Sequence, residues 1–413
     1  MSKFKQIKLI DIAASGRSVI SGPFGSNIGK RFFQESGVPI IRGNNLTTDS
    51  KKFVDEGFVY LSEEKADELN SDAIEGDILF TAAGTIGQVG MIPRSAAYKR
   101  YVISNKQLRF RVDPKKANSD YVYYWLASPW IFKTILNKNT GSTVPLINLG
   151  IIKSLPISLP EDVYEQEKIA NVISKIDSKI ELNNLINAEL EAMAKTLYDY
   201  WFVQFDFPFD FAQGKPAANG KPYKSSGGKM VYNPILKREI PEGWDARKLG
   251  EVISLEYGKP LKTELRTGSG FPVVGSNGVI GFHAEFLVKG PGIVVGRKGT
   301  VGAVTFLHDN FFPIDTTYFV QPKIGIKFYY LKFLLDSLGL NKMNSDSAVP
   351  GLNREAALRI PIVGIPEEII SFFEKTVMAF FKKLETNNKE NEILVKLRDW
   401  LLPMLMNGQV TVK

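Results

Sequence analysis

Gly84-Thr85-Ile86-Gly87 recurs in the second half of the chain as Gly299-Thr300-Val301-Gly302. Two further segments recur around it in the same order: Ser142–Asn148 (STVPLIN) as Ser347–Asn353 (SAVPGLN), and Leu155-Pro156-Ile157 as Ile360-Pro361-Ile362. This period is too long for a solenoid repeat of roughly 20 to 50 residues. The chain therefore carries two copies of a whole module, an arrangement that suits a target with two parts.

The composition is that of a globular protein. A length of 413 residues allows two or three domains, and 44% of the residues are hydrophobic. No apolar run reaches the roughly 18 residues that a membrane span needs, and no signal peptide is expected. The absence of cysteine excludes disulfides and thiolate metal sites and favours a reducing cytoplasm. The net charge of +8 suits a polyanionic partner, although many basic proteins bind no nucleic acid.

The expected fold class is α+β, with two mixed α/β domains, each followed by a long helix, in a pseudo-two-fold internal repeat. Short β-branched and aromatic runs such as 38–41 and 107–112 predict strands, and the apolar spacing within 120–138 predicts a helix. A helix over 328–340 corresponds to it in the second copy. The predicted organisation is a first module (1–160), a long helix (161–204), an irregular exposed linker (205–240), a second module (241–364), a second long helix (365–406) and a tail (407–413).

Both long helices show a heptad pattern. In the first, the two apolar rows are Ile169, Ile176, Asn183, Leu190, Leu197 and Ile173, Ile180, Asn187, Ala194, Trp201. In the second they are Phe373, Phe380, Asn387, Leu394, Leu401 and Val377, Leu384, Asn391, with Arg398 as an interruption. A stripe this narrow needs a partner helix, so we expect the two helices to pair as an antiparallel coiled coil.

The four asparagines are expected to fix the register of this pair. Asn387 and Asn391 follow Asn183 and Asn187 by 204 positions in both cases (387 − 183 and 391 − 187). A buried asparagine costs stability but specifies register and orientation. In an antiparallel pair the four amides would form one polar layer. The alternative is that the stripe turns outward here and the amides are solvated.

No catalytic constellation is found in the sequence. The only histidines, His283 and His308, lack companions at metal-ligand spacing, and no glycine-rich segment has the spacing of a phosphate-binding loop. We therefore expect a binding protein with no metal and no cofactor of its own. Its candidate nucleic-acid contacts are polar and basic residues in loops. In the first module they are Lys30, Arg31, Arg42, Asn44, Asn45, Thr85, Lys99, Arg100, Lys106 and Ser142; in the second they are Lys259, Lys262, Arg266, Ser276, Asn277, Arg297, Lys298 and Thr300.

In this order, the motifs resemble the DNA specificity subunit of type I restriction–modification systems. Ser21–Ser26 (SGPFGS) with Gly37–Asn45 (GVPIIRGNN) resembles one type of target-recognition domain, and Gly275–Gly281 with Gly296–Gly302 resembles another. Glu165–Ala170 and Leu190–Val203 resemble the ends of the family's central helix, and Leu401–Gly408 the end of its distal helix. One departure is that Ile365-Pro366-Glu367-Glu368 lacks a counterpart of Gln166.

The resemblance implies a non-catalytic subunit whose two recognition domains read different halves of a bipartite, asymmetric site in double-stranded DNA. It further implies that the helix pair sets the spacer and docks two modification subunits, which carry S-adenosylmethionine and methylate a flipped adenine, and that a motor–nuclease subunit joins for restriction. Three alternatives remain open: a stand-alone architectural or regulatory DNA-binding protein, a coiled-coil scaffold for proteins, and the recognition subunit of a related system that cleaves on both sides of its site.

Overall fold

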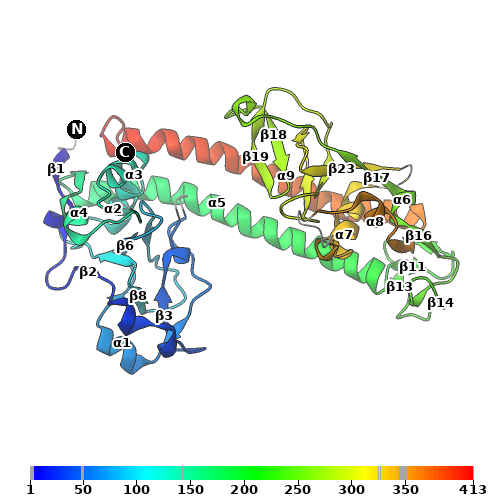
Figure 1. Cartoon of the computed structure of the whole chain (residues 1–413), viewed down its shortest axis with the longest axis horizontal. Coiled ribbons are helices and arrows are strands. Elements are labelled where there is room, and N and C mark those ends of the chain that lie inside the picture. The colour runs from blue at the N-terminus through cyan, green and yellow to red at the C-terminus, as the bar shows by residue number, and fades with distance from the viewer. Residues whose placement is uncertain are drawn as a thin grey trace. The chain divides into compact units, whose positions relative to one another are not determined.

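The computed structural model describes residues 4–47, 51–141, 143–323, 325, 327–343 and 351–412. Ser142, and residues 347–350 of the second SAVPGLN copy, lie outside this range. The chain forms two compact units, 1–183 with 389–413 and 184–388, and each is described by itself. The two long helices, α5 (Val163–Tyr198) and α9 (Glu367–Met406), contribute residues to both units (Figure 1). In the described part of the chain, no helix has the length and apolar character to cross a membrane.

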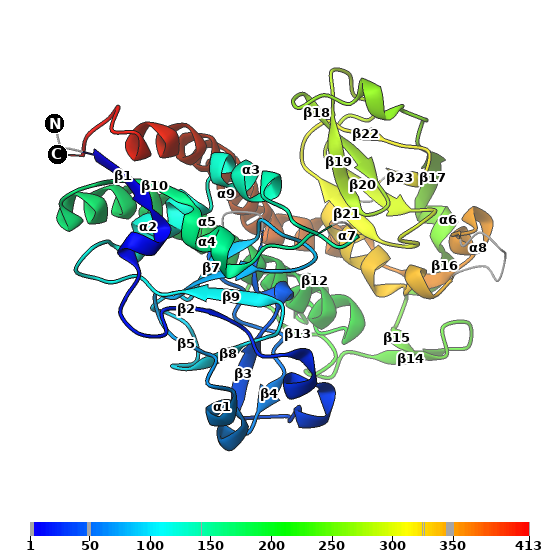
Figure 2. The ribbon, with the colours of Figure 1, turned by 60° about the vertical axis from the view of Figure 1, so that its left-hand side comes forward.

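The first module is built on two small sheets. The first sheet is antiparallel and has the order β2 (Val19–Ser21), β9 (Gln107–Phe110), β6 (Ile78–Thr81), β7 (Val89–Met91). The second has the order β4 (Tyr60–Leu61), β3 (Val38–Ile41), β8 (Tyr101–Ile103), β5 (Asp72–Ala73), with β3 and β8 parallel. β1 (Phe4–Lys8) pairs with β10 (Pro156–Pro160). α1 (Glu63–Leu69) lies beside the second sheet (Figure 2), where Ala66 joins a core cluster with Val38, Ile40 and Leu61.

The helix expected over 120–138 is in fact two helices, α2 (Ser119–Leu126) and α3 (Pro129–Asn137). Pro129 explains the break, because proline has no N–H to continue a helix and favours its first position. Ser128 accordingly has extended backbone angles and forms the N-cap of α3. A short helix, α4 (Leu149–Ser154), completes the first module.

The second module repeats the topology of the main sheet, and its second sheet has three strands instead of four. Its four-stranded antiparallel sheet has the order β17 (Ile253–Tyr257), β23 (Thr317–Pro322), β20 (Gly292–Gly296), β21 (Val304–Leu307). Its second sheet has the order β19 (Gly278–His283), β18 (Phe271–Gly275), β22 (Phe312–Pro313), and β18 and β22 are parallel, as β3 and β8 are. β16 (Asp245–Lys248) pairs with β24 (Pro361–Gly364), and the helices are α6 (Leu249–Val252), α7 (Phe328–Ser337) and α8 (Arg354–Leu358).

The repeated Gly-Thr-x-Gly segment connects two strands of the main sheet in each module. It lies between β6 and β7 in the first module and between β20 and β21 in the second. Gly84 and Gly87 have φ of 93° and 92°, and Gly299 and Gly302 have φ of 78° and 73°. These are left-handed conformations that residues with a Cβ adopt at a cost. The turn therefore explains why both glycines appear in both copies.

The expectation of an irregular, exposed linker over 205–240 is wrong at its aromatic residues. Phe205 and Phe207 are buried, and the ring of Phe207 stacks on Tyr223 and on Trp244 at centroid distances of 4.8 and 5.4 Å. This stack, together with short strand pairings, orders the segment. Its strands are β11 (Pro208–Asp210), β12 (Lys215–Pro216), β13 (Lys221–Pro222), β14 (Met230–Asn233) and β15 (Arg238–Pro241).

The long helices contact each other in the first unit. The Asn183 amide donates to Asn391 Oδ1 at 2.9 Å, and Arg398 Nη1 lies 3.2 Å from Asp177 Oδ1. The two helices therefore run antiparallel where they make these contacts. Arg398 interrupts the apolar row because it faces this carboxylate, whose pKa is raised by burial. Tyr124 of α2 also donates to Asp177, which ties the first module to the helices.

The second unit contains the other amide pair. The Asn387 amide donates to Asn187 Oδ1 at 2.8 Å, and the Asn187 amide donates to Asn388 Oδ1 at 2.8 Å. Asn183 and Asn387 are 1% and 0% exposed, so one amide in each unit is removed from water. Every predicted heptad position on α5 and α9 is buried or half-buried. The amides are therefore hydrogen-bonded to other amides, which contradicts the alternative that they are solvated.

In each copy, a polar side chain of a long helix forms a hydrogen bond with the module. The residue that does so differs between the two copies. Buried Gln166 of α5 accepts from the N–H of Asn118, next to α2, at 2.9 Å and donates to the carbonyl of Pro160 at 2.8 Å. In the second unit, Glu374 of α9 accepts from the N–H of Tyr330 in the first turn of α7 at 2.7 Å. This half-buried carboxylate does for α7 what Gln166 does for α2. Burial raises the pKa of Glu374 to about 7.

We predict that Glu374 makes the second unit less stable as the pH rises from about 4.5 to about 7. The folded chain keeps the Glu374 proton up to about pH 7, whereas the unfolded chain loses it near the ordinary pKa of 4.5. Because the native state binds more protons in this window, its stability falls as the pH rises through it. Glu374→Gln removes this dependence. Relative to wild type, the variant gains on the order of 1–3 kcal/mol between pH 4.5 and pH 8.

Urea denaturation at pH 4.5, 6 and 8 measures the difference. Glu368→Gln is the matched control, because it removes an exposed carboxylate near the start of the same helix. If the free energy of unfolding changed equally with pH in Glu374→Gln and in wild type, the burial of Glu374 would not affect stability.

Candidate nucleic-acid interface

A polar pocket lies at the edge where the two sheets of the first module meet. Its volume is about 370 Å³, and its lining comes from several separate loops. The lining residues are Ile28, Phe33, Ile40, Arg42, Gly43, Thr81, Ala83, Gly84, Thr85, Gln88, Ser104, Asn105, Lys106 and Gln107. Three of the predicted contacts, Arg42, Thr85 and Lys106, are therefore brought together from distant parts of the sequence.

Hydrogen bonds hold the polar groups of the pocket in place. The Thr81 hydroxyl donates to Gln88 Oε1 at 2.7 Å, and Gln88 Nε2 donates to the carbonyl of Leu46 at 2.9 Å. Gln107 is fully buried and shares a hydrogen bond with Ser104. The two bonds of Gln88 fix the orientation of its amide, which is what a site needs if it is to distinguish the edges of bases.

The mouth of the pocket carries positive charge. Lys106 and Thr85 are exposed there, and Arg42 is half-buried. Arg42 donates through Nη2 to the carbonyl of Gly57 at 3.0 Å, while its buried Nε has no hydrogen-bond partner among the described residues. Two cations beside fixed amides can bind a phosphate and a base edge together.

Sequence reasoning missed the amides of this pocket. Gln88 directly follows the Gly84–Gly87 turn, and Asn105 and Gln107 flank Lys106. Their position beside predicted contacts was the available signal. It was not sufficient, because only the pairing of β6 with β9 brings Thr81 opposite Gln107 and joins the two loops.

Two predicted contacts of the first module have internal roles instead. Asn45 is 0% exposed, and its amide donates to the carbonyls of Val54 and Glu56 at 2.9 and 3.0 Å. Its Oδ1 accepts from the N–H of Arg42 at 2.9 Å. Asn45 therefore has no surface left for a ligand and leaves the predicted set.

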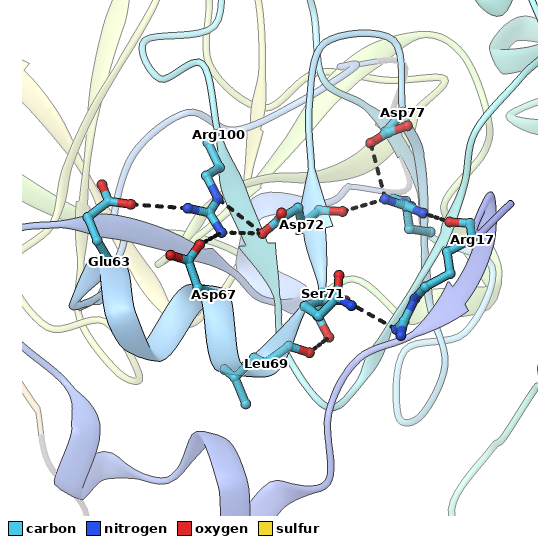
Figure 3. A network of polar contacts seen from close by, with 10 residues as sticks. Arg17, Glu63, Asp67, Leu69, Ser71, Asp72, Asp77 and Arg100 are labelled. Atoms are coloured by element: carbon cyan, nitrogen blue, oxygen red, sulfur yellow. Dashed lines mark hydrogen bonds and ion pairs between the residues drawn. The ribbon is translucent and has the colours of Figure 1, made fainter.

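Arg100 is surrounded by carboxylates. Figure 3 shows its guanidinium turned toward Glu63, Asp67 and Asp72, with N···O distances of 3.1, 2.6 and 3.0 Å. The hydrogen bond to Asp67 raises the pKa of Arg100 further. Because three acids compete for this cation, a phosphate gains little from it, and Arg100 also leaves the set.

The other predicted residues of the first module that the structure describes are exposed. Lys30 and Arg31 lie in the segment that ends at Phe33 of the pocket, with the Arg31 guanidinium 4.7 Å from the ring centroid of Phe32. Asn44 is exposed next to Gly43, and Lys99 is exposed but does not line the pocket.

In the second module, three of the eight predicted residues, Arg297, Lys298 and Thr300, lie in the loop between β20 and β21. Lys298 and Thr300 are exposed in it. Arg297 donates to the carbonyl of Asp315 through Nε and Nη2 at 3.1 and 2.5 Å, with its guanidinium 5.5 Å from the ring centroid of Tyr257. Arg297 is thus held at the start of the turn by a carbonyl and an aromatic face.

The remaining five candidates of the second module differ in exposure. Lys259, Lys262 and Asn277 are exposed. Ser276 is 9% exposed and its hydroxyl donates to the carbonyl of Thr316 at 2.7 Å, so it supports the loop and leaves the predicted set. Arg266 is half-buried, with its Nη2 3.5 Å from the carbonyl of Leu261.

Strand register shows which positions of the two modules correspond. Thr81 is paired with Gln107 in the first module, and Gly296 with Thr317 in the second. The next hydrogen bond along the chain repeats as well, since the N–H of residue 82 donates to the carbonyl of residue 106 and that of residue 297 to the carbonyl of residue 316, at 2.7 and 2.9 Å.

Different side chains occupy these matched positions. Ala82 corresponds to Arg297, and Lys106 corresponds to Thr316. The second module therefore has a half-buried arginine where the first has a buried alanine, and a threonine where the first has an exposed lysine. Two such surfaces suit two different ligand sequences.

Among the described residues, no three histidine, aspartate or glutamate side chains come close enough together to hold a metal ion. His283 is the last residue of β19, and its Nδ1 lies 3.0 Å from the carbonyl of Leu265. The polar groups that line the pocket are amides, hydroxyls and cations.

Comparison with known proteins agrees with this geometry. The family model for the type I restriction modification DNA specificity domain matches residues 1–192 and 241–395. The chain is 25% identical to the MjaIX specificity subunit of Methanocaldococcus jannaschii, over 82% of this chain and 78% of that protein. It is 26% identical to the HindI specificity subunit of Haemophilus influenzae, over 75% and 81%.

A solved structure shares the fold. The S subunit of a type I restriction–modification system from M. genitalium superimposes with a TM-score of 0.60 at 20% identity, covering 98% of this chain and 96% of that one. The duplicated modules, the matched family model on both of them and this fold lead to one conclusion: the chain belongs to the type I restriction–modification DNA specificity family.

Proposed function

We propose that this chain is the DNA-specificity subunit of a type I restriction–modification complex and that each module reads one half of a bipartite, asymmetric site. The observation that carries this proposal is the pair of matched frames with unmatched side chains, Ala82 against Arg297 and Lys106 against Thr316. A palindromic target would call for two similar surfaces. Two different ones on the same topology suit two different half-sites.

In the first module, Lys106 and Arg42 neutralise phosphates while the amide of Gln88 pairs with a base edge. Asparagine and glutamine amides pair with adenine, and lysine and arginine with guanine or phosphate. The hydrogen bonds from Thr81 and to Leu46 fix the Gln88 amide before DNA arrives, so little freedom is lost on binding.

In the second module, Arg297 is the principal reader. Its guanidinium lies against the ring of Tyr257, and the bonds from Nε and Nη2 to the carbonyl of Asp315 fix its orientation at the start of the loop between β20 and β21. A positioned guanidinium makes paired hydrogen bonds to guanine in the major groove. Lys298 and Thr300 add contacts to the backbone of the same half-site.

The two long helices serve as a ruler. We propose that α5 and α9 pair along their length as an antiparallel coiled coil in a pseudo-two-fold frame. Helices of 36 and 40 residues have lengths of about 54 and 60 Å. The contacts Asn183–Asn391 and Asn187–Asn387 support a single register, which would keep the spacer between the half-sites constant.

The chemistry of the complex belongs to partners. Two modification subunits would dock around the helices, bring S-adenosylmethionine and methylate an adenine in each half-site, and a motor–nuclease subunit would join them for restriction. The chain itself would recognise and position the DNA. What supports this division is the family membership together with the binding character of the pocket groups.

The central prediction is methylation of one bipartite motif by the reconstituted complex. Co-expression with the modification subunit of the same system should yield a complex that methylates adenine in both halves of one asymmetric motif, as read by methylation-sensitive sequencing. The isolated chain should transfer no methyl group. Tight, sequence-specific binding by the isolated chain, with no gain from the partner, would instead identify a stand-alone DNA-binding protein.

Lys106→Ala should weaken binding through one half-site. The loss of one phosphate contact lowers affinity roughly threefold to tenfold and reduces the salt slope by about 1. Titration of the complex with motif duplexes at several salt concentrations measures both. Lys99→Ala is the matched control, because it removes an exposed lysine of the same module that does not line the pocket. Equal losses for the two variants would show that the pocket is not the contact.

Removing one heptad from each helix should shorten the spacer. Deletion of residues 178–184 with 390–396 removes the Asn183–Asn391 pair and leaves the Asn187–Asn387 pair to set the register. Seven residues are about 10.5 Å, which corresponds to about 3 base pairs. Sequencing of the methylated motif should show the same half-sites around a shorter spacer. Changed half-sites around an unchanged spacer would contradict the ruler role.

A further inference from the structure

Phe24 is 85% exposed, more than any other large hydrophobic residue in the described part of the chain. Single exposed hydrophobic residues are common on protein surfaces, so exposure alone indicates nothing. Phe24 differs from the others in three respects: the rigidity of its backbone, its neighbours, and the residue at the matched position of the second module.

The backbone around Phe24 is tightly held. The N–H of Gly22 donates to the carbonyl of Gln107 at 2.9 Å, and a Cβ at position 22 would lie 1.8 Å from the carbonyl oxygen of Ser104. After Phe24, the N–H of Asn27 donates to the Phe24 carbonyl at 2.9 Å, and Ile28 is buried in a core cluster with Val38 and Ile40. The aromatic side chain is therefore carried on a fixed support.

This support is one wall of the polar pocket. Ile28 and Phe33 of the same segment line the pocket, and a Cβ at Gly25 would lie 3.1 Å from Asn105 Nδ2, which also belongs to the lining. Lys30, on the same segment, and Lys106, at the mouth, are exposed cations. Phe24 thus stands at the rim of a site that combines phosphate-binding charge with base-reading amides.

The second module has the same support without the ring. The N–H of Gly258 donates to the carbonyl of Thr317 at 3.1 Å, and a Cβ there would lie 2.2 Å from the carbonyl oxygen of Ile314. Gly258 therefore corresponds to Gly22, because Thr317 corresponds to Gln107 by strand register. Two residues further on, Pro260 stands where the first module has Phe24.

We propose that Phe24 is an intercalating wedge that enters the base stack of the half-site read by the first module. This inference rests on the proposed function. A base that is to be methylated must leave the duplex, and apolar side chains that insert between base steps stabilise the unstacked DNA. Lys30 and Lys106 hold the phosphates, the amides of the pocket read the neighbouring bases, and the ring of Phe24 fills the gap. With Pro260 at the matched position, the second half-site receives no aromatic wedge.

The test uses the complete complex with its modification partner and duplexes of the motif found by sequencing. 2-Aminopurine replaces single bases in turn in each half-site, and its fluorescence rises where stacking is lost. The half-site of the first module is the one whose binding Lys106→Ala weakens. Wild type should give a fluorescent position there, Phe24→Ala should lose it with an affinity loss of about tenfold, and Phe24→Trp should keep it.

Three readouts separate a wedge from a general contact. Phe24→Ala removes no charge, so the salt slope should stay at the wild-type value, in contrast to Lys106→Ala. The methylation rate should fall in the first half-site and stay unchanged in the second. Pro260→Ala is the matched control and should change no signal. The melting temperatures of all variants should equal that of wild type, since Phe24 packs against little protein.

The outcomes distinguish the two levels of the proposal. If wild type binds and methylates its motif but Phe24→Ala gives the same fluorescence and affinity, the wedge is wrong and the specificity function stands. Loss of the signal in Phe24→Trp as well as in Phe24→Ala would also overturn stacking by the ring. If the wild-type complex neither binds nor methylates any motif, the proposed function itself fails.

Discussion

Both candidate sites depend on the hydrogen bonds between the two middle strands of each module's main sheet, which are β6 with β9 and β20 with β23. Thr81 pairs with Gln107 at the start of β9, and Gly296 pairs with Thr317 at the start of β23. In each module, this pairing places the Gly-Thr-x-Gly turn next to the loop that precedes β9 or β23. The N–H of Gly22 and that of Gly258 then bond to the carbonyls of Gln107 and Thr317. Backbone bonds of this kind do not depend on side-chain identity. Surface residues can therefore change from one module to the other while the loops keep their places.

The same separation between frame and surface holds for the long helices. Heptad rows and amide pairs occur in both helices at the same interval, and each unit contains one bonded pair. Asn183 Oδ1 and Asn387 Oδ1 are buried without a partner among the described residues, so the amides do not maximise stability. A cost of this kind is understandable where register matters more than stability. The side chains that link the modules to the long helices differ between the two copies. Buried Gln166 and half-buried Glu374 each accept a hydrogen bond from a backbone N–H of their module, but from different positions along α5 and α9.

The parts of the fold that sequence reasoning predicted are those with a strong local signal. The helices around Asn183 and Asn387 have a period, and the Gly84–Gly87 turn has a pair of residues that tolerate positive φ. Errors arose where one local signal overrode another. Pro129 divided a stretch whose apolar spacing predicted one helix, and the ring stack of Phe207 ordered a segment whose composition predicted an irregular, exposed linker.

Patterns along the chain were sufficient to predict two modules and two long helices, because duplication, periodicity and turn glycines can be recognised in the sequence. The sequence also supplied most of the exposed cations of the candidate sites. Tertiary contacts were needed to distinguish the exposed polar residues from those that are bonded within the protein. Asn45, Arg100 and Ser276 look like contacts in the sequence but are taken up by carbonyls or carboxylates of distant segments. Gln88 and Phe24 gained their candidate roles in the same way, because a side chain's availability depends on partners that only folding brings within reach.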